Sequence, residues 1–379
     1  MATFLPEHEA FRDGVRAFVE REIAPHVAAW DEAETFPREL YRRAAEVGLL
    51  GIGYPEELGG TPADVWYRLI ATEEVARAGS GGLMASLFSH NIGLPPIVAH
   101  ASPALQRHIV PGVLAGEKIA ALAITEPSGG SDVARLRTTA RRDGNAWVID
   151  GEKAFITSGL RADWITLAVR TGGPGASGIS LIAVPGDSPG LTRSPLAKMG
   201  WWCSDTAQLR FDGCRVPADH LIGEENAGFR AIMENFNGER LLMAAGACAF
   251  AEVCYDEALD WARQRQTFGA PLASHQAIRH KLMDMKMRIA STRAWLHALV
   301  EREEAGDDGS AWVAELCLLK NHATQAMQFC ADQAVQILGA MGFMRGTKSE
   351  RIYREVKVMM IGGGAEEIMK ELAARQLGV

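Results

Sequence analysis

One carboxylate interrupts the apolar face of a long helical pattern between Asn226 and Cys254. The spacings along this face are four, three, four, three and four, in the residues Ile232, Phe236, Glu239, Met243, Gly246 and Phe250. This is the period of one buried helix face. A carboxylate in such a seam loses hydration, so its pKa rises towards the range of a useful general base. A helix-surface Glu paired with Lys or Arg is the common alternative, and both interpretations remain open at this point.

Two further segments combine turn-forming residues with donors. Residues 125–132, TEPSGGSD, form a tight turn in which glycine lets backbone N–H groups approach an anion, while Thr125 and Ser131 add hydroxyl donors. In residues 151–158, GEKAFITS, Phe155 and Thr157 lie on one face of a predicted strand. Such a pair can stack on a planar ring and donate to a ring nitrogen. An ordinary Gly-rich turn and an edge-strand pair are the respective alternatives.

Three segments towards the C-terminus also contain glycine turns that suit ligand binding. Residues 263–272, RQRQTFGAPL, place basic groups and a glycine turn after a helix, which suits pyrophosphate binding. Residues 335–342 read VQILGAMG, and residues 361–368 read IGGGAEEI. In the last segment three glycines ahead of a helix expose backbone donors to a ligand. A solvated helix end and a flexible loop are the alternatives.

The elements that must position these segments change type twice along the chain. Residues 1–115 are mainly helical in pattern, with helices predicted over 11–23, 38–50 and 66–77 and a loop at 54–60. Residues 116–225 show strand patterns at 146–149, 164–169 and 179–184. Residues 226–379 return to long helical patterns, broken by loops at 306–310 and near 339–346. The sequence predicts a mainly helical α+β protein: a helical domain, a central β-domain and a C-terminal antiparallel four-helix bundle.

The composition narrows the functional classes. A net charge of −8 without a basic block argues against a nucleic-acid partner. The longest apolar run, 241–251, is too short to span a membrane, and the N-terminus lacks a secretory pattern. The six cysteines lack CxxC pairs and indicate reduced thiols, and the ten histidines lack a metal-binding spacing. We therefore expect a cytoplasmic enzyme without a catalytic metal.

Taken together, the order and wording of these motifs resemble the acyl-CoA dehydrogenase family over essentially the whole chain. The motifs that carry the resemblance are TEPSGGSD, GEKAFITSG, KMGWWCSDT at 198–206, RQTFG and the C-terminal Gly-rich loop. The resemblance implies FAD between the β-domain and the bundle. Residues 122–131 would line the flavin, with Leu122, Thr125 and Ser131 among its contacts. Phe155 would lie against the flavin ring, and Thr157 near its N5.

The resemblance also implies a homo-oligomer, usually a tetramer. The residues expected to reach the FAD of a neighbouring subunit are Arg265, Thr267, Phe268, Gln276, Gln336 and Gly339. Ala340 replaces a second glycine that is common in relatives, which could slightly alter the pyrophosphate contact.

The sequence departs from the family at the catalytic position. Many members carry the base in a Tyr-Glu-Gly-Thr segment of the last loop, where this chain has Gly362-Gly363-Gly364-Ala365. A subset that includes isovaleryl-, long-chain- and citronellyl-type dehydrogenases carries it on the first long C-terminal helix, in a Glu-Arg pair. This chain has Glu239-Arg240 there, so both arguments lead to Glu239. Glu366 and Glu367 are expected at the start of the following helix, where a carboxylate favours the helix dipole.

The implied reaction is α,β-dehydrogenation of an acyl-CoA thioester, in which Glu239 takes the α-proton. The backbone N–H of Gly363 would bind the thioester oxygen, and Ser131, Asn237 and Arg240 would contact the substrate or orient the loop. An electron-transferring flavoprotein is the expected acceptor. The alternatives are a flavin monooxygenase or oxidase, a non-catalytic flavin- or acyl-CoA-binding protein, and a carrier-protein-tethered substrate. The sequence does not fix the length or branching of the acyl chain.

Overall fold

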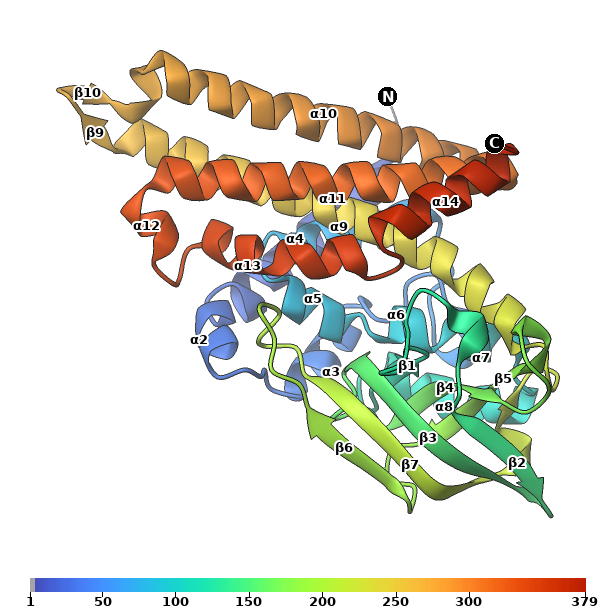
Figure 1. The fold of residues 1–379 in the computed structure, drawn as a ribbon. Coiled ribbons are helices and arrows are strands. Elements are labelled where there is room, and N and C mark those ends of the chain that lie inside the picture. The colour runs from blue at the N-terminus through green and yellow to red at the C-terminus, as the bar shows by residue number, and fades with distance from the viewer. Residues whose placement is uncertain (1–3) are drawn as a thin grey trace.

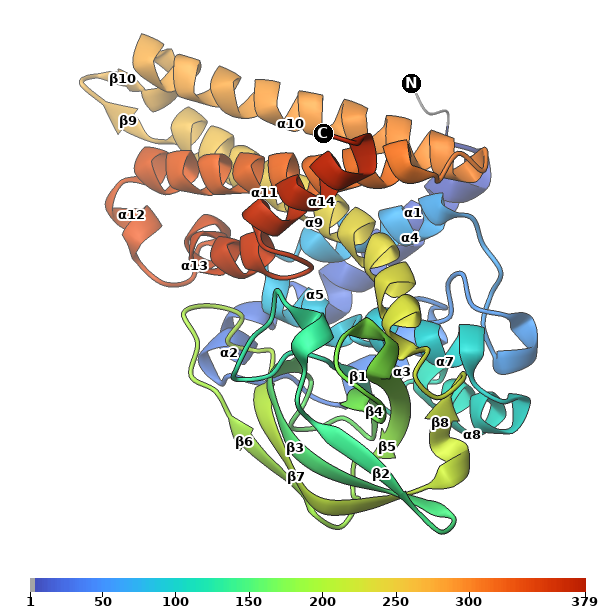
Figure 2. The same ribbon diagram turned by 45° about the vertical axis from the view of Figure 1, so that its right-hand side comes forward.

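The computed structural model describes residues 4–379 as a helical N-terminal part, a sheet and a C-terminal bundle (Figure 1). Figures 1 and 2 show the bundle on one side, the sheet on the other, and the N-terminal helices between them. The predicted mainly helical α+β class is confirmed.

The N-terminal part consists of short helices. They are α1 (Pro6–Phe18) with a π-helical turn (Val19–Ile23), α2 (Val27–Glu32), α3 (Glu39–Glu46), α4 (Val65–Ala76), α5 (Gly81–Leu87), α6 (His90–Gly93), α7 (Pro95–His100) and α8 (Pro103–Leu114). The helix predicted over 38–50 is shorter in the structure, because α3 ends at Glu46 and Gly48 takes a positive φ of 76° that favours glycine. Apolar side chains of α1, α3 and α4 share one core with the bundle.

The β-domain is an eight-stranded sheet with the order β6-β7-β3-β2-β4-β5-β8, and β1 pairs with β4 in parallel. The strands are β1 (Ala120–Ala123), β2 (Thr139–Asp143), β3 (Ala146–Thr157), β4 (Trp164–Arg170), β5 (Ile179–Pro185), β6 (Leu191–Pro195), β7 (Thr206–Pro217) and β8 (Leu221–Ile222). One cluster packs parts of β4 and β5 against α7 and α8. A second cluster joins Leu167 of β4 to Ile149 of β3 and Phe211 of β7, so the sheet curves around its own core.

A β-bulge distorts β3 near its end. The register against β7 shifts between Lys153 and Ile156, so one extra residue lies on β3. Phe155 in this bulge has a φ of 61°, which is rare for an aromatic residue, and its side chain is 67% exposed. Its neighbours Ala154 and Ile156 are buried. The bulge therefore aims one aromatic ring out of the sheet.

The bundle is built from long helices in antiparallel succession (Figure 1). They are α9 (Gly228–Gln264), α10 (Gln276–Glu304) and α11 (Ser310–Leu338), joined by α13 (Lys348–Ile361), with α14 (Glu366–Leu377) packed on α11. A small hairpin of β9 (Gln266–Thr267) and β10 (Ala270–Pro271) links α9 to α10. The loop predicted near 339–346 is only partly a loop, because α12 (Ala340–Phe343) lies within it.

The loop between β6 and β7 closes the junction of the three parts. Trp201 packs so closely on the start of α5 that an added Cβ on Gly82 would lie 2.8 Å from its Cα. The Trp202 ring lies 3.8 Å from the guanidinium carbon of Arg354 on α13. Beside them, the buried Glu355 carboxylate accepts the Gly81 N–H at 2.7 Å. The sheet is thus anchored to α5 and α13 rather than loosely tethered.

A buried ion pair anchors the turn at residues 125–132. Lys153 Nζ on β3 lies 2.9 Å from Glu126 Oε1 and donates to the Ile124 carbonyl at the same distance. Glu126 also accepts the N–H groups of Arg137 and Thr138 at 2.7 and 2.8 Å. Burial lowers the pKa of Lys153 to about 8, and the Glu126 carboxylate opposes this effect. The pair fixes where the glycine-rich turn leaves the sheet.

We predict that Glu126→Gln lowers the free energy of unfolding by about 3–5 kcal/mol, because it leaves the Lys153 ammonium buried without a carboxylate. Urea unfolding followed by tryptophan fluorescence measures the change. The double variant Glu126→Gln/Lys153→Met should regain most of the loss. The control Glu152→Gln removes a half-exposed carboxylate from β3, the strand that carries Lys153. It should change the free energy of unfolding by less than about 1 kcal/mol. Equal stability of Glu126→Gln and Glu152→Gln would contradict the prediction.

Candidate active site

Glu239 lies on α9 without a partner. Its side chain is partly buried, and among the described residues it accepts no hydrogen bond and has no Lys, Arg or His nitrogen within 4.0 Å. The alternative of a paired surface carboxylate therefore does not describe this residue. One turn earlier, Phe236 packs in the same apolar cluster as Leu122 of β1, which brings this part of α9 against the β-domain. The unpaired carboxylate thus lies close to the junction of bundle and sheet.

The surroundings of Glu239 shift its affinity for a proton. Burial raises the pKa of Glu239 to about 7, and the positive charges of Arg240 and Lys320 oppose the rise. A carboxylate with this pKa is ionised in an appreciable fraction at neutral pH and is more basic than an ordinary Glu. Both properties suit a general base.

Two buried cations hold the loop between α13 and α14. Arg240 Nε donates to the Gly363 carbonyl at 3.0 Å, and its Nη1 donates to Asn237 Oδ1 at 3.2 Å. Lys320 Nζ donates to the carbonyls of Met360 and Gly364 at 3.1 and 2.8 Å. Among the described residues no carboxylate lies within salt-bridge distance of either cation. The loop is therefore fixed through its carbonyl groups.

The conformation of Gly363 leaves a backbone donor free. Its N–H has no hydrogen-bond acceptor in the part of the chain that the structure describes. Its φ is 65°, and an added Cβ would lie 2.7 Å from Met243 Sδ on α9. The Met243 thioether thus fills the space into which a side chain at position 363 would project. Glu366 and Glu367, by contrast, lie in the first turn of α14, as predicted.

The turn at residues 125–132 lies beside the bulge of β3. The Ala154 N–H donates to the Thr125 carbonyl at 2.9 Å, so the turn starts next to the exposed Phe155 ring. Thr125 is partly buried, and Ser131 is exposed. At the end of β3, the partly buried Thr157 pairs with Thr206 of β7. An outward aromatic ring, hydroxyl groups and a glycine-rich backbone in one place fit a planar cofactor that carries an anionic tail.

The other residues predicted to bind the cofactor lie elsewhere. Thr267 and Phe268 belong to the β9–β10 hairpin, and Phe268 is fully exposed at its turn with a φ of 52°. Gln276 starts α10, and Gln336 and Gly339 lie at the end of α11, next to α12. These elements meet at one end of the bundle, far from the sheet (Figure 1). Within one chain, this group, which also includes the exposed Arg265, is not brought to Glu239.

The sequence analysis missed Lys320 as a site residue. Lys320 lies in the segment 316–320, LCLLK, on the buried face of α11, and its side chain is fully buried. A lysine that continues an apolar run at helical spacing was the available signal, because such a lysine needs oxygen partners in the interior.

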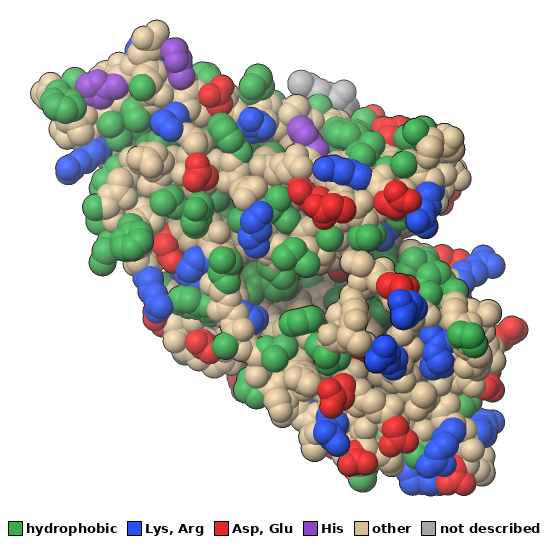
Figure 3. Space-filling model, in the orientation of Figure 1, with side chains coloured by type: hydrophobic (Ala, Val, Ile, Leu, Met, Phe, Trp, Pro, Cys, Tyr) green, Lys and Arg blue, Asp and Glu red, His purple; other side chains and the backbone are tan. Residues whose placement is uncertain are grey.

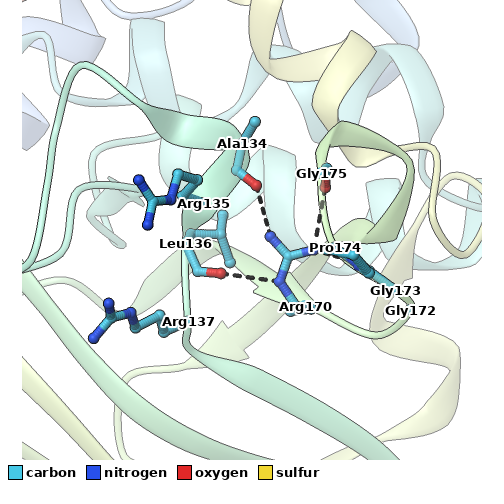
Figure 4. Close-up of a pocket in the computed structure, with 9 residues that line it drawn as sticks. All are labelled: Ala134, Arg135, Leu136, Arg137, Arg170, Gly172, Gly173, Pro174 and Gly175. Carbon is cyan, nitrogen blue, oxygen red and sulfur yellow. Dashed lines mark hydrogen bonds between the residues drawn. The ribbon is translucent and has the colours of Figure 1, made fainter.

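Two features of the surface complete the description. Figure 3 shows hydrophobic side chains gathered along a hollow between the bundle and the sheet. A separate open pocket is lined by residues 134–137 and by residues 170 and 172–175. In it, Arg170 donates to the carbonyls of Ala134 and Leu136 at 2.8 and 3.0 Å, whereas Arg135 and Arg137 make no bond with the other residues drawn (Figure 4). Arg170 also donates to the Gly175 carbonyl at 3.1 Å, so it links the 134–137 segment to the 172–175 loop.

No described helix is long and apolar enough to cross a membrane. All six cysteines are buried and unpaired with one another.

Nearly the whole chain is matched by models of one protein family. Three family models match in order: the acyl-CoA dehydrogenase N-terminal domain over residues 5–117, the middle domain over 121–214 and the C-terminal domain over 226–378. The long-chain specific acyl-CoA dehydrogenase of Sus scrofa mitochondria is 37% identical over 99% of this chain and 87% of its own length. The isovaleryl-CoA dehydrogenase of Oryza sativa mitochondria is 34% identical, over 97% of this chain and 90% of its own length.

A crystal structure of a probable acyl-CoA dehydrogenase from Mycobacterium abscessus superposes with a TM-score of 0.97. Its sequence is 48% identical, and the alignment covers 100% of both chains. With three domain models matched in order and relatives aligned along nearly its whole length, this chain belongs to the acyl-CoA dehydrogenase family.

Proposed function

We propose that this protein catalyses FAD-dependent α,β-dehydrogenation of an acyl-CoA thioester to the 2-enoyl-CoA, with Glu239 as the base. The observation that carries the assignment of the base is the state of Glu239: partly buried, unpaired, and with a pKa raised to about 7 by burial. Its neighbour in sequence, Arg240, holds the loop that contains the unpaired Gly363 N–H. A proton acceptor and a backbone donor are thus tied to one short stretch of α9.

Different residues accept the proton, stabilise the negative charge and hold the substrate. Ionised Glu239 takes the proton from the carbon next to the thioester carbonyl and becomes neutral. The negative charge that develops on the thioester oxygen is stabilised by the Gly363 N–H, which needs no reorganisation because its loop is already fixed. Asn237 and Ser131 contact the substrate, and Arg240 orients the loop. FAD, when bound, would supply the acceptor for the β-hydrogen, which leaves the substrate as a hydride.

The cofactor site follows from the same placement. Leu122, Thr125 and Ser131 would hold the flavin and its pyrophosphate, with Phe155 against the ring and Thr157 as a hydrogen-bond donor to it. What supports this is the outward Phe155 ring beside the glycine-rich turn. An electron-transferring flavoprotein in the cytoplasm would be the acceptor of the electrons that the reaction releases.

Glu239→Gln should lower the rate constant of flavin reduction by acyl-CoA by at least about 10²-fold, because an amide cannot accept the α-proton. Anaerobic rapid mixing with isovaleryl-, butyryl- and palmitoyl-CoA, followed at the flavin absorbance, measures this rate and ranks the acyl chains. The wild-type rate should fall as the pH drops below about 7, because Glu239 then becomes protonated.

The matched control is Glu366→Gln, which changes a carboxylate nearer in sequence to Gly363 and should keep most of the rate. Wild-type rates in Glu239→Gln would remove Glu239 as the base. Absence of bleaching in FAD-loaded wild type would turn attention to carrier-protein-tethered substrates or to oxygen chemistry. Neither the family placement nor the geometry at Glu239 favours a monooxygenase or a non-catalytic protein.

The free energy of unfolding should also depend on the protonation of Glu239. Because the pKa of Glu239 is raised above its ordinary value of 4.5, the folded protein binds this proton more tightly than the unfolded chain does. Its contribution to stability is present below pH 4.5 and is lost as the pH rises through about 7. Glu239→Gln should therefore be more stable than wild type at pH 8, by about 1–3 kcal/mol, with little difference at pH 4.5. Urea unfolding at the two pH values measures this, and a difference that is the same at both would contradict the assignment.

The cofactor site is proposed to be completed by a second subunit of a homotetramer. The residues at the hairpin end of the bundle would hold the FAD of the neighbour: Arg265, Thr267, Phe268, Gln276, Gln336 and Gly339. Their position away from the sheet of their own chain supports this proposal. Large apolar side chains are exposed at the same end of the bundle, among them Phe268, Phe343 and Met344. An exposed patch of this kind is typical of an interface between subunits.

Phe268→Ser should lower FAD affinity about tenfold or more and weaken the oligomer, because it removes an exposed aromatic anchor. Light scattering gives the mass, and the flavin-to-protein ratio gives the occupancy. Leu377→Ser, at the end of α14, is the control; it also removes an exposed apolar side chain, although Leu377 is 55% exposed and Phe268 is fully exposed. Full FAD occupancy in a monomeric wild type would contradict the proposal.

A further inference from the structure

Burial of Lys320 on α11 costs folding free energy. Lys320 is fully buried, yet no carboxylate of the described residues lies within salt-bridge distance of its ammonium. The chain's other fully buried lysine in the core, Lys153, has Glu126 at 2.9 Å. Burying an ammonium without a counter-ion costs several kcal/mol, and an apolar residue of similar volume is often more stable. Stability alone therefore does not explain a lysine at position 320.

The hydrogen bonds of the Lys320 ammonium all lead to the segment around Gly363. Its ammonium binds the Met360 carbonyl at the end of α13 and the Gly364 carbonyl just before α14. Arg240 binds the Gly363 carbonyl between them from the opposite helix, α9. Cations thus bind carbonyls before and after the peptide group that carries the free Gly363 N–H, which restrains the segment around it.

The charge of Lys320 also acts on Glu239. The charged and titratable groups that face Lys320 are Glu239 and Arg240 from α9, Glu366 from α14 and Cys317 from α11 itself. The Glu366 carboxylate is engaged by Gln325 Nε2 at 2.7 Å. Lys320 favours the ionised form of Glu239, and burial lowers the pKa of Lys320 itself to about 8.

We propose that Lys320 is a positioning residue for proton abstraction: its ammonium clamps the Met360–Gly364 loop through two carbonyls and supplies positive charge that acts on Glu239. The proposal rests on the proposed function, because it assumes that Glu239 is the base. Lys320 touches neither substrate nor cofactor in this account. It acts through the loop and through the carboxylate.

Two variants separate the clamp from the charge. Lys320→Gln keeps N–H donors for the carbonyls and removes the charge, whereas Lys320→Met removes both. Asn321→Leu is the matched control. Asn321 Nδ2 holds the Glu366 carbonyl at 2.9 Å, so its loss loosens the same region without changing any charge.

The experiment measures the rate constant of flavin reduction in the FAD-loaded enzymes, by rapid mixing with acyl-CoA between pH 5.5 and 9. Both Lys320 variants should move the acidic limb of the profile upward by about 1 unit. This shift corresponds to an about fivefold slower reaction at pH 7. At pH 9, where Glu239 is ionised in every variant, Lys320→Met should remain slower than Lys320→Gln because its loop has lost the clamp. Asn321→Leu should leave the limb in place.

An unshifted limb in both Lys320 variants, in a protein whose wild-type limb disappears with Glu239→Gln, would overturn the role of Lys320 and leave the proposed function intact. Equal rates for the Met and Gln variants at pH 9 would overturn the clamp. A wild type that no acyl-CoA reduces would instead overturn the proposed function, and the role of Lys320 with it.

Discussion

The site depends on one arrangement of charge: two buried cations that have no carboxylate partner within residues 4–379 and that both bind a glycine loop. Arg240 from α9 donates to the Gly363 carbonyl. Lys320 from α11 donates to the carbonyls of Met360 and Gly364. Carbonyl dipoles compensate a buried charge only in part, so the region keeps a positive potential. Glu239 lies in that potential and in an apolar seam at once. The two influences oppose each other, and their balance keeps the carboxylate both basic and ionisable near neutral pH.

The rest of the fold can be understood as support for this balance. The length of α9, 37 residues, lets one helix contact the β-domain near Phe236, carry Glu239 at the junction and join the bundle core beyond it. Its buried middle is rich in alanine, which allows close approach of the neighbouring helices. On the sheet side, the Glu126–Lys153 pair performs the opposite electrostatic task from Lys320. The Glu126 carboxylate neutralises the Lys153 ammonium, so the pair adds no net charge beside the glycine-rich turn, where the backbone N–H groups are the donors.

Local patterns predicted much of this structure because the relevant signals were local. The period of α9 and the alternation in β4 and β5 follow from which faces are buried, and the single carboxylate in the α9 seam stood out for that reason. The bulge at Phe155 could not be predicted, because it depends on one extra residue relative to β7, a partner more than fifty residues away. Lys320 was missed because its meaning comes from the carbonyls of a distant loop. The hairpin residues were assigned from a resemblance, and a single chain does not contain the surface that would test them.

The thioether of Met243 has a consequence for how such a site can change over evolutionary time. A carboxylate at position 363 would meet Met243 Sδ at 2.7 Å from its Cβ and would need a left-handed backbone, at a cost of roughly 1–2 kcal/mol for the backbone alone. Overpacking adds about 1–3 kcal/mol more. Moving the proton acceptor from helix to loop is therefore not a single step for this chain. A side chain at position 363 requires a change at position 243 as well. Met243, which otherwise only packs beside the loop, is therefore a steric barrier to any side chain at position 363.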